Sequence, residues 1–268
     1  MKICVLRSGS SGNCTFIEHN GLRMLLDAGG MSQRRLREVL KEIDLEPENL
    51  NALLITHTHS DHVNYSALKV CEKCNITVYI HEVNAEVLGN IVGSKLMSRI
   101  RLVKFGDTPF EIDQKVQITP FEVSHDAPKI TNGFSILDEQ GKSFAYAADL
   151  GYFPDSLAPK FNNASIVFLE ANHDLKLLWD NPRRPYIHKK RVAGIYGHLS
   201  NEQTATALLR VFDTSETMPL SVVLCHLSQD HNSPEIAIEK ISEILDKEGV
   251  TIPLNVATRH HRTDFFEL

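Results

Sequence analysis

The chain has 268 residues and carries 28 Lys and Arg against 34 Asp and Glu, a formal charge of −6 with neutral histidines. Its 42% hydrophobic and 23% charged residues are close to the globular average, which excludes disorder, collagen and coiled coil for the whole chain. No apolar stretch approaches the ~20 residues of a membrane helix, and the N-terminal apolar run is too short for a signal peptide. With five cysteines that lack a disulfide spacing, we expect a cytoplasmic protein without a membrane partner.

Apolar runs and turn residues predict the elements in chain order. Strands are expected at 1–8, 13–20, 23–29, 51–57, 76–81, 101–105, 115–124, in a hairpin over 133–149, and at 165–170, 220–226 and 252–256. Helices are expected at 32–44, from about 65 to 73, around 82–97, at 201–213 and at 234–248. The stretch 176–193 contains Pro and is rich in Arg and Lys, and it is interpreted as a long loop.

The order of these elements predicts the fold class. Strands come first in a meander and then alternate with helices, and this happens twice along the chain. Such an order is typical of two mixed β-sheets with helices packed outside them. We therefore expect an α/β protein, an αββα sandwich that forms a single domain over residues 1–268.

Histidine is unusually frequent, with 13 residues, and four metal-binding side chains lie together directly after the predicted strand 51–57. These are His57, His59, Asp61 and His62. Side chains in a loop at a strand end can converge on one point, and imidazole with carboxylate is the ligand set that zinc, manganese or iron requires. Further candidate ligands follow later predicted strands: His125, Asp149 and His226. The pattern predicts a metal site.

The HxHxDH motif, followed in order by a histidine, an aspartate and a histidine, resembles the metallo-β-lactamase fold family over nearly the whole chain. The resemblance implies two divalent metal ions, zinc or manganese with iron also compatible. It implies that the first ion is held by His57, His59 and His125. It implies that the second is held by Asp61, His62 and His226. Asp149 would then bridge the ions, Asp27 would support the histidine loop, and a metal-bridging hydroxide would be the nucleophile of a hydrolase.

Two further residues favour phosphodiester substrates. Glu170 ends the predicted strand 165–170, and His198 precedes the predicted helix 201–213. The pair resembles the glutamate and histidine of tRNase Z and the β-CASP nucleases, in which the histidine protonates the departing oxygen. An alkoxide leaving group needs a general acid, and a histidine beside a carboxylate provides one. Glu170, His198 and Asp61 are therefore the expected catalytic residues.

The motifs SGSSGN at 8–13, THxHxDH and GHLSNE are most similar to those of the compact YycJ/WalJ-type exonucleases. This similarity implies a 5′-to-3′ exonuclease that acts on DNA, favoured over RNA. The backbone contacts would come from the basic residues of 176–193, which are Arg183, Arg184, Lys189, Lys190 and Arg191. Trp179, Tyr186 and Tyr152 would stack on unpaired bases.

Two other functions stay open on the sequence. The first is a small-molecule hydrolase of the same fold that acts on a thioester, a lactone or a cyclic nucleotide. The second is a non-catalytic or redox metal module. The sequence leaves the metal, the oligomeric state and the roles of His231, His260 and His261 undecided.

Overall fold

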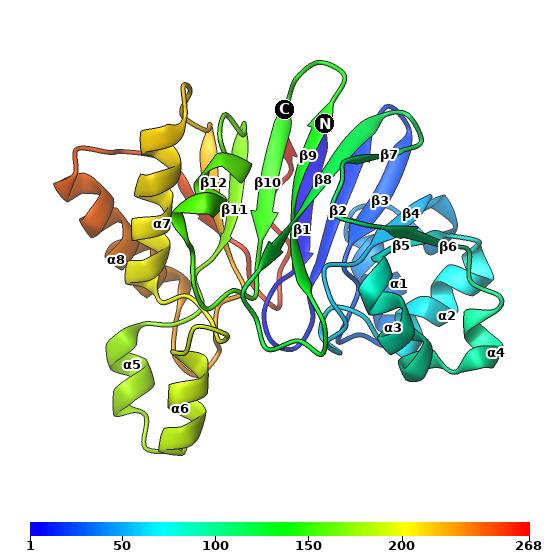
Figure 1. Ribbon diagram of the computed structural model, residues 1–268, viewed down its shortest axis with the longest axis horizontal. Coiled ribbons are helices and arrows are strands. Elements are labelled where there is room, and N and C mark those ends of the chain that lie inside the picture. The colour runs from blue at the N-terminus through cyan, green and yellow to red at the C-terminus, as the bar shows by residue number, and fades with distance from the viewer. The chain divides into compact units, whose positions relative to one another are not determined.

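A computed structural model describes residues 1–268 (Figure 1), and the chain divides into two compact units. The first unit comprises Met1–Pro120, Ala127–Ile130 and Arg259–Leu268. The second unit comprises Phe121–Asp126 and Thr131–Thr258. The single domain expected over residues 1–268 stays a prediction.

The first sheet has seven strands and is mixed. Its order is β14 (Phe266–Glu267), β1 (Lys2–Arg7), β2 (Cys14–His19), β3 (Leu22–Leu26), β4 (Ala52–Leu54), β5 (Thr77–His81) and β6 (Leu102–Phe105). The strands from β14 to β3 pair antiparallel, and those from β3 to β6 pair parallel. Asn20 and Gly21 both have positive φ, of 47° and 80°, which is what a two-residue turn between β2 and β3 requires.

Helices of the first unit join the parallel strands. They are α1 (Gln33–Lys41), α2 (Tyr65–Cys74), α3 (Ala85–Val92) and α4 (Ser94–Met97), with short 3₁₀ turns at Pro47–Asn49 and Glu82–Asn84. The side chain of Ser32 accepts a hydrogen bond from the Arg35 backbone and caps α1, as the sequence indicates. The helix expected over 82–97 is divided at Gly93, whose φ of +76° ends one helix before the next begins.

The second sheet also has seven strands and is mixed. Its order is β13 (Leu254–Val256), β12 (Ser221–Cys225), β11 (Ile166–Glu170), β10 (Ser143–Ala147), β9 (Thr131–Asp138), β8 (Val116–Val123) and β7 (Phe110–Ile112). Strands β10 to β13 pair parallel, whereas β9 pairs antiparallel with β10. The carboxyl ends of β10, β11 and β12 therefore lie at the same edge, which in such sheets is where functional side chains gather.

The loop expected over 176–193 is wrong, because this stretch contains helices. They are α5 (Leu175–Asp180) and α6 (Tyr186–Val192), which form a hairpin set apart from α7 (Asn201–Thr214) and α8 (Pro234–Lys247) of the same unit (Figure 1). Leu178 is fully buried, and Lys189 Nζ donates a hydrogen bond to the Trp179 carbonyl at 2.6 Å. These contacts hold two helices that are too short to be stable alone.

Most of the other predicted elements are present. The chain has two mixed seven-stranded sheets with flanking helices, which confirms the predicted fold class. The short strands β7 and β14 and the 3₁₀ turn Asp155–Lys160 were not predicted. No helix combines the length and the apolar character that crossing a membrane requires.

Candidate metal centre

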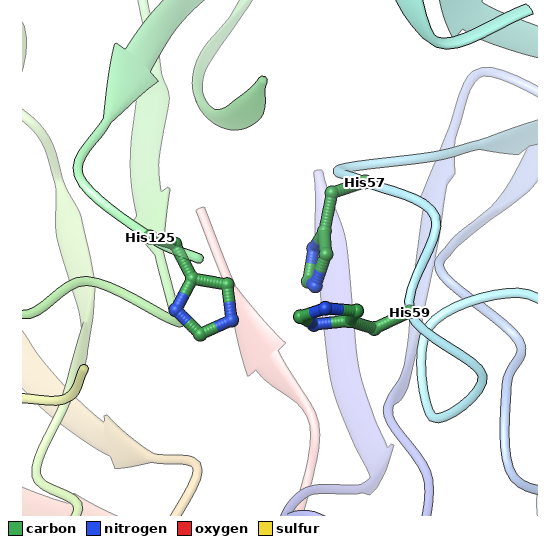
Figure 2. Close-up of side chains that lie close together, drawn as sticks. All are labelled: His57, His59 and His125. Atoms are coloured by element: carbon green, nitrogen blue, oxygen red, sulfur yellow. The ribbon is translucent and has the colours of Figure 1, made fainter. Parts of the chain in front are cut away.

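The four candidate metal ligands of the HxHxDH motif lie in the loop between β4 and α2. His57 and His62 are buried, while His59 and Asp61 are partly exposed. The rings of His57 and His59 meet edge to face with centroids 4.7 Å apart (Figure 2), and those of His57 and His62 are 4.1 Å apart. The first unit thus places the rings of His59 and His62 against that of His57.

Asp27, which follows β3, holds this loop from behind. Its Oδ2 accepts a hydrogen bond from His62 Nδ1 at 2.7 Å and from Thr56 Oγ1 at 2.8 Å, and the Thr56 hydroxyl oxygen accepts one from His57 Nδ1 at 3.1 Å. These bonds keep the ring proton on Nδ1 and make Nε2 the basic nitrogen of both histidines. Asp27 is completely buried and has a φ of +58°. The supporting role implied for Asp27 matches this geometry.

Sequence reasoning missed the part that Asn13 plays in the same loop. The Asn13 backbone N–H donates to the Asp61 carbonyl at 2.8 Å, and its side-chain amide lies 2.9 Å from His62 Nε2. Gly29 packs so closely that an added Cβ would lie 2.1 Å from the Asp61 carbonyl carbon. The turn at 8–13 and the glycines after β3 therefore position the loop that carries the HxHxDH motif. A phosphate contact by that turn stays a prediction.

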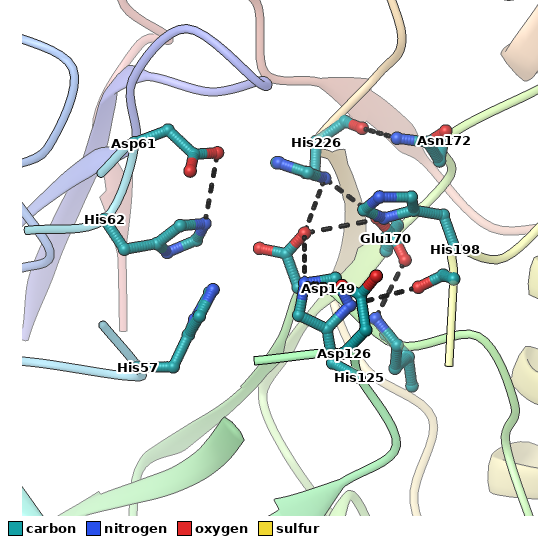
Figure 3. Close-up of polar contacts among 12 residues, drawn as sticks. His57, Asp61, His62, His125, Asp126, Asp149, Glu170, Asn172, His198 and His226 are labelled. Carbon is teal, nitrogen blue, oxygen red and sulfur yellow. Dashed lines mark hydrogen bonds and ion pairs between the residues drawn. The ribbon is translucent and has the colours of Figure 1, made fainter. Parts of the chain in front are cut away.

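The second unit brings a separate group of polar side chains to the carboxyl ends of its strands (Figure 3). Asp149 follows β10, Glu170 ends β11 and His226 follows β12. Asp149 and His226 both have a φ of +57°, a left-handed conformation that is uncommon outside glycine and is found at functional sites. Asp149 Oδ1 lies 3.3 Å from His226 Nδ1 and 3.7 Å from His125 Nε2. The separate predictions at strand ends thus become one cluster.

Glu170 is the centre of this cluster. It is fully buried, and its Oε1 accepts hydrogen bonds from His198 Nδ1 at 2.7 Å and His226 Nδ1 at 2.8 Å. Its Oε2 accepts the backbone N–H groups of Leu150 and Leu199 at 3.0 and 3.2 Å. Burial opposes the charged carboxylate, but the two imidazoles outweigh burial and lower the pKa of Glu170 to about 2. Glu170 is therefore a fixed anion that orients two histidines.

His198 and His125 respond differently to their surroundings. Burial opposes the protonation of His198, but Glu170 and Asp149 raise its pKa above the usual range. The side chain remains 20% exposed, so its tip can reach a bound substrate. Burial lowers the pKa of His125, whose Nδ1 lies 3.2 Å from the Gly197 carbonyl. His198 is thus suited to donate a proton, and His125 to remain neutral as a ligand requires.

Each unit carries imidazole and carboxylate donors of the kinds that bind a divalent metal ion. The Nδ1 atoms of His57, His125 and His226 lie within hydrogen-bond distance of an oxygen atom, which leaves Nε2 as the nitrogen available to a metal. In the second unit, ligand atoms of Asp149, Glu170, His198 and His226 lie within 4.8 Å of one another. Buried clusters of histidine and aspartate are what a metal site requires.

A family comparison decides the relationship of the chain. The model of the beta-lactamase superfamily domain matches residues 23–227, which contain every site residue named above except Asn13. The chain belongs to the beta-lactamase superfamily. The fold class predicted from the motifs, the metallo-β-lactamase fold, is therefore confirmed.

Curated relatives and solved structures within the superfamily match most of the chain. Exodeoxyribonuclease WalJ of Streptococcus pneumoniae is 34% identical over 238 residues, which are 88% of this chain and 85% of the relative. Exodeoxyribonuclease YycJ of Bacillus anthracis is 29% identical over 260 residues, 97% of this chain and 94% of the relative. The crystal structure of the metallo-β-lactamase fold protein YhfI from Bacillus subtilis has a TM-score of 0.72 at 16% identity, covering 98% of this chain and 99% of that one.

Proposed function

We propose that the chain is a metal-dependent exodeoxyribonuclease that removes nucleotides from the 5′ end of DNA. Its 34% identity with WalJ over 88% of the chain supports the activity. We propose the ligand set that the family resemblance implies. The first ion would be held by His57, His59 and His125, and the second by Asp61, His62 and His226, with Asp149 shared between them. Zinc and manganese are the ions we expect, and iron is compatible with the same ligands.

The Glu170–His198 pair is the observation that carries the proposal. When bound, two divalent ions would acidify a water molecule and neutralise charge on the phosphate. The alkoxide that leaves a phosphodiester also needs a proton, which a thioester hydrolase needs less. His198, held by a buried carboxylate at 2.7 Å and with a raised pKa, can supply that proton from its exposed edge.

The α5–α6 hairpin offers the kind of surface that single-stranded nucleic acid binds. Trp179 and Tyr186 are 41% and 66% exposed with ring centroids 5.9 Å apart, and Lys190 Nζ lies 5.4 Å from the Tyr186 centroid. Aromatic side chains beside cations stack on bases and contact phosphates. We therefore propose that this hairpin contacts the DNA substrate.

Three of the five basic residues predicted to contact DNA are already paired or buried. Arg184 pairs with Asp230, Arg191 Nε donates to Asp126 at 2.6 Å, and Lys189 is buried. We therefore expect Arg183 and Lys190 to make the phosphate contacts.

DNA degradation by metal-loaded protein tests the proposed function. The purified chain is loaded separately with manganese and with zinc and incubated with end-labelled single-stranded and double-stranded DNA. Progressive release of mononucleotides from the 5′ end, lost in His198→Ala, is the expected result. Intact DNA with every metal, together with turnover of S-lactoylglutathione, would instead favour the small-molecule hydrolase.

Salt dependence tests the hairpin contacts. The variant Arg183→Glu should weaken DNA binding and reduce the slope of log Kd against log salt by about 1, because one phosphate contact is lost. Arg184→Gln is the matched control, since its guanidinium already pairs with Asp230, and it should change the slope less. An unchanged slope in Arg183→Glu would contradict a phosphate contact at this position.

The cytoplasmic location stays a prediction.

A further inference from the structure

Three histidines of the second unit lie outside the proposed metal ligands, and each has a buried ring nitrogen without a hydrogen-bond partner. These nitrogens are Nδ1 and Nε2 of His173, Nδ1 of His188 and Nε2 of His231. His173 is completely buried, and His231 is 2% exposed. A neutral imidazole always carries one N–H, and buried polar groups are rarely left unsatisfied. The unsatisfied nitrogens therefore point to a ligand.

The three histidines come from separate segments that backbone hydrogen bonds tie together. The Asp174 N–H donates to the His231 carbonyl at 2.8 Å, and the His173 carbonyl accepts from Asn201 N at 2.9 Å, where α7 begins. His188 lies on α6 with its ring centroid 6.4 Å from that of His231. The cluster is therefore built into the fold at the base of the α5–α6 hairpin.

The cluster lies close to the proposed general acid. The His173 N–H donates to the carbonyl of Leu199, the residue after His198, at 3.4 Å. Burial is the main cause that lowers the pKa of His173 and of His188, and the charge of His198 adds to it. The cations Arg184 and Arg191 act on His188 in the same direction. Arg184 also lines an open surface pocket of about 620 Å³ together with Asp230, the residue before His231. None of the three histidines lines this pocket, but Asp230 places its wall next to His231 along the chain.

The three histidines do not form a metal site. Zinc would need ligand atoms about 2.0–2.1 Å from one centre. None of the groups of potential metal ligands with atoms within 4.8 Å of one another includes His173, His188 or His231. A tetrahedral oxyanion has several acceptor oxygens and can bridge N–H donors that lie further apart, and nearby cations favour its charge.

We propose that His173, His188 and His231 form a subsite for the terminal 5′-phosphate of the DNA substrate. This inference rests on the proposed function. When a 5′ exonuclease releases the first nucleotide, the departing oxygen is the 3′ oxygen of that nucleotide. Because His198 gives it a proton, the terminal nucleotide lies on the His198 side, and its own 5′-phosphate lies one nucleotide away. The histidine cluster is next to His198 and is therefore in the right region.

The test compares two oligonucleotides that differ only in carrying a 5′-phosphate or a 5′-hydroxyl group. Release of the first nucleotide is measured with the full-length, manganese-loaded protein. The wild type should prefer the 5′-phosphate by about tenfold or more, as expected for charge-assisted hydrogen bonds. His188→Ala and His231→Ala should lower the rate on the phosphorylated end and leave the 5′-hydroxyl rate unchanged, which also shows that the variants are folded.

Matched variants separate a phosphate contact from a packing role. Asn at position 188 keeps an N–H donor near the Nδ1 position, and Gln at position 231 keeps one near Nε2. His188→Asn and His231→Gln should therefore retain most of the preference. A wild type that cleaves both ends equally, or a preference that survives in both alanine variants, overturns the subsite and leaves the nuclease assignment intact. Failure to cleave any DNA overturns the proposed function itself.

Discussion

Replacing Glu170 by Gln should separate general-acid catalysis from metal binding. The carboxylate accepts two imidazole N–H groups on Oε1 and two backbone N–H groups on Oε2. In Gln, an NH₂ group replaces one of the two carboxylate oxygens. Whichever oxygen it replaces, two N–H donors that were bonded to that oxygen then face another donor. Removing one partner from a buried charged network costs about 3–5 kcal/mol. We expect a loss of unfolding free energy of that size.

The same change should slow DNA cleavage far more than cleavage of an activated ester. Without the carboxylate, the pKa of His198 falls and its ring orientation is no longer fixed, so proton donation to the alkoxide is lost. A general acid contributes about 10²–10⁴-fold, and we expect this loss on DNA. Bis-p-nitrophenyl phosphate releases a stable phenolate that needs no proton, so its cleavage should fall by less than about tenfold.

The assay measures kcat/KM for both substrates at saturating manganese. His198→Ala is the matched control, because it removes the acid but keeps the bond between Glu170 and His226. Since the protonated form of His198 is the active one and Glu170 raises its pKa, the alkaline limb of the rate profile should move to lower pH in Glu170→Gln.

Equal losses on DNA and on the activated ester would refute this reasoning, since they would mean that Glu170 acts through His226 and the metal site. Full DNA cleavage by His198→Ala would refute it as well.

Three further changes test how the first unit supports its metal-binding loop. Asp27→Asn should reduce metal affinity by about 10–100-fold, because the amide no longer holds His62 in the required tautomer; metal titration measures this, and unchanged affinity would contradict it. Gly29→Ala should lower both metal content and melting temperature, because the new Cβ would overlap the loop backbone; a variant with full metal content would show that the loop adapts. Glu42→Gln should destabilise the protein by about 1–2 kcal/mol at pH 7 in urea unfolding, a modest value because Glu42 is 34% exposed although its partner Arg7 is buried. Arg7 lowers the pKa of Glu42, so the difference from wild type should be present above about pH 4.5 and vanish as the pH falls through the lowered pKa; a difference that persists in acid would contradict the ion pair.

Much of the fold and part of the site are local properties of the sequence. Alternation of apolar residues and the turn at Asn20 and Gly21 predict the opening meander, because strand pairing there is between neighbours. The spacing of His57, His59 and His62 in a loop after a buried strand predicts metal chemistry for the same reason. Local signals fail over 176–193, where Pro and charged residues favour a loop. The two short helices there depend on tertiary contacts, among them the burial of Leu178 and the hydrogen bond from Lys189 to the Trp179 carbonyl.

Only the tertiary structure decides which ring nitrogen of each histidine is basic and in which direction the pKa of each carboxylate shifts. Glu170 receives its four hydrogen bonds from residues that lie 20, 28, 29 and 56 positions away along the chain. The spacing of residues along the sequence cannot predict such contacts, because the pKa and the tautomer of a group depend on the atoms that surround it after folding. The unsatisfied ring nitrogens of His173, His188 and His231 are likewise a property of the folded chain that the sequence does not predict. The sequence identifies histidines and carboxylates that can bind metal or transfer a proton. Which of these roles each residue can take depends on the groups that are buried beside it in the folded chain.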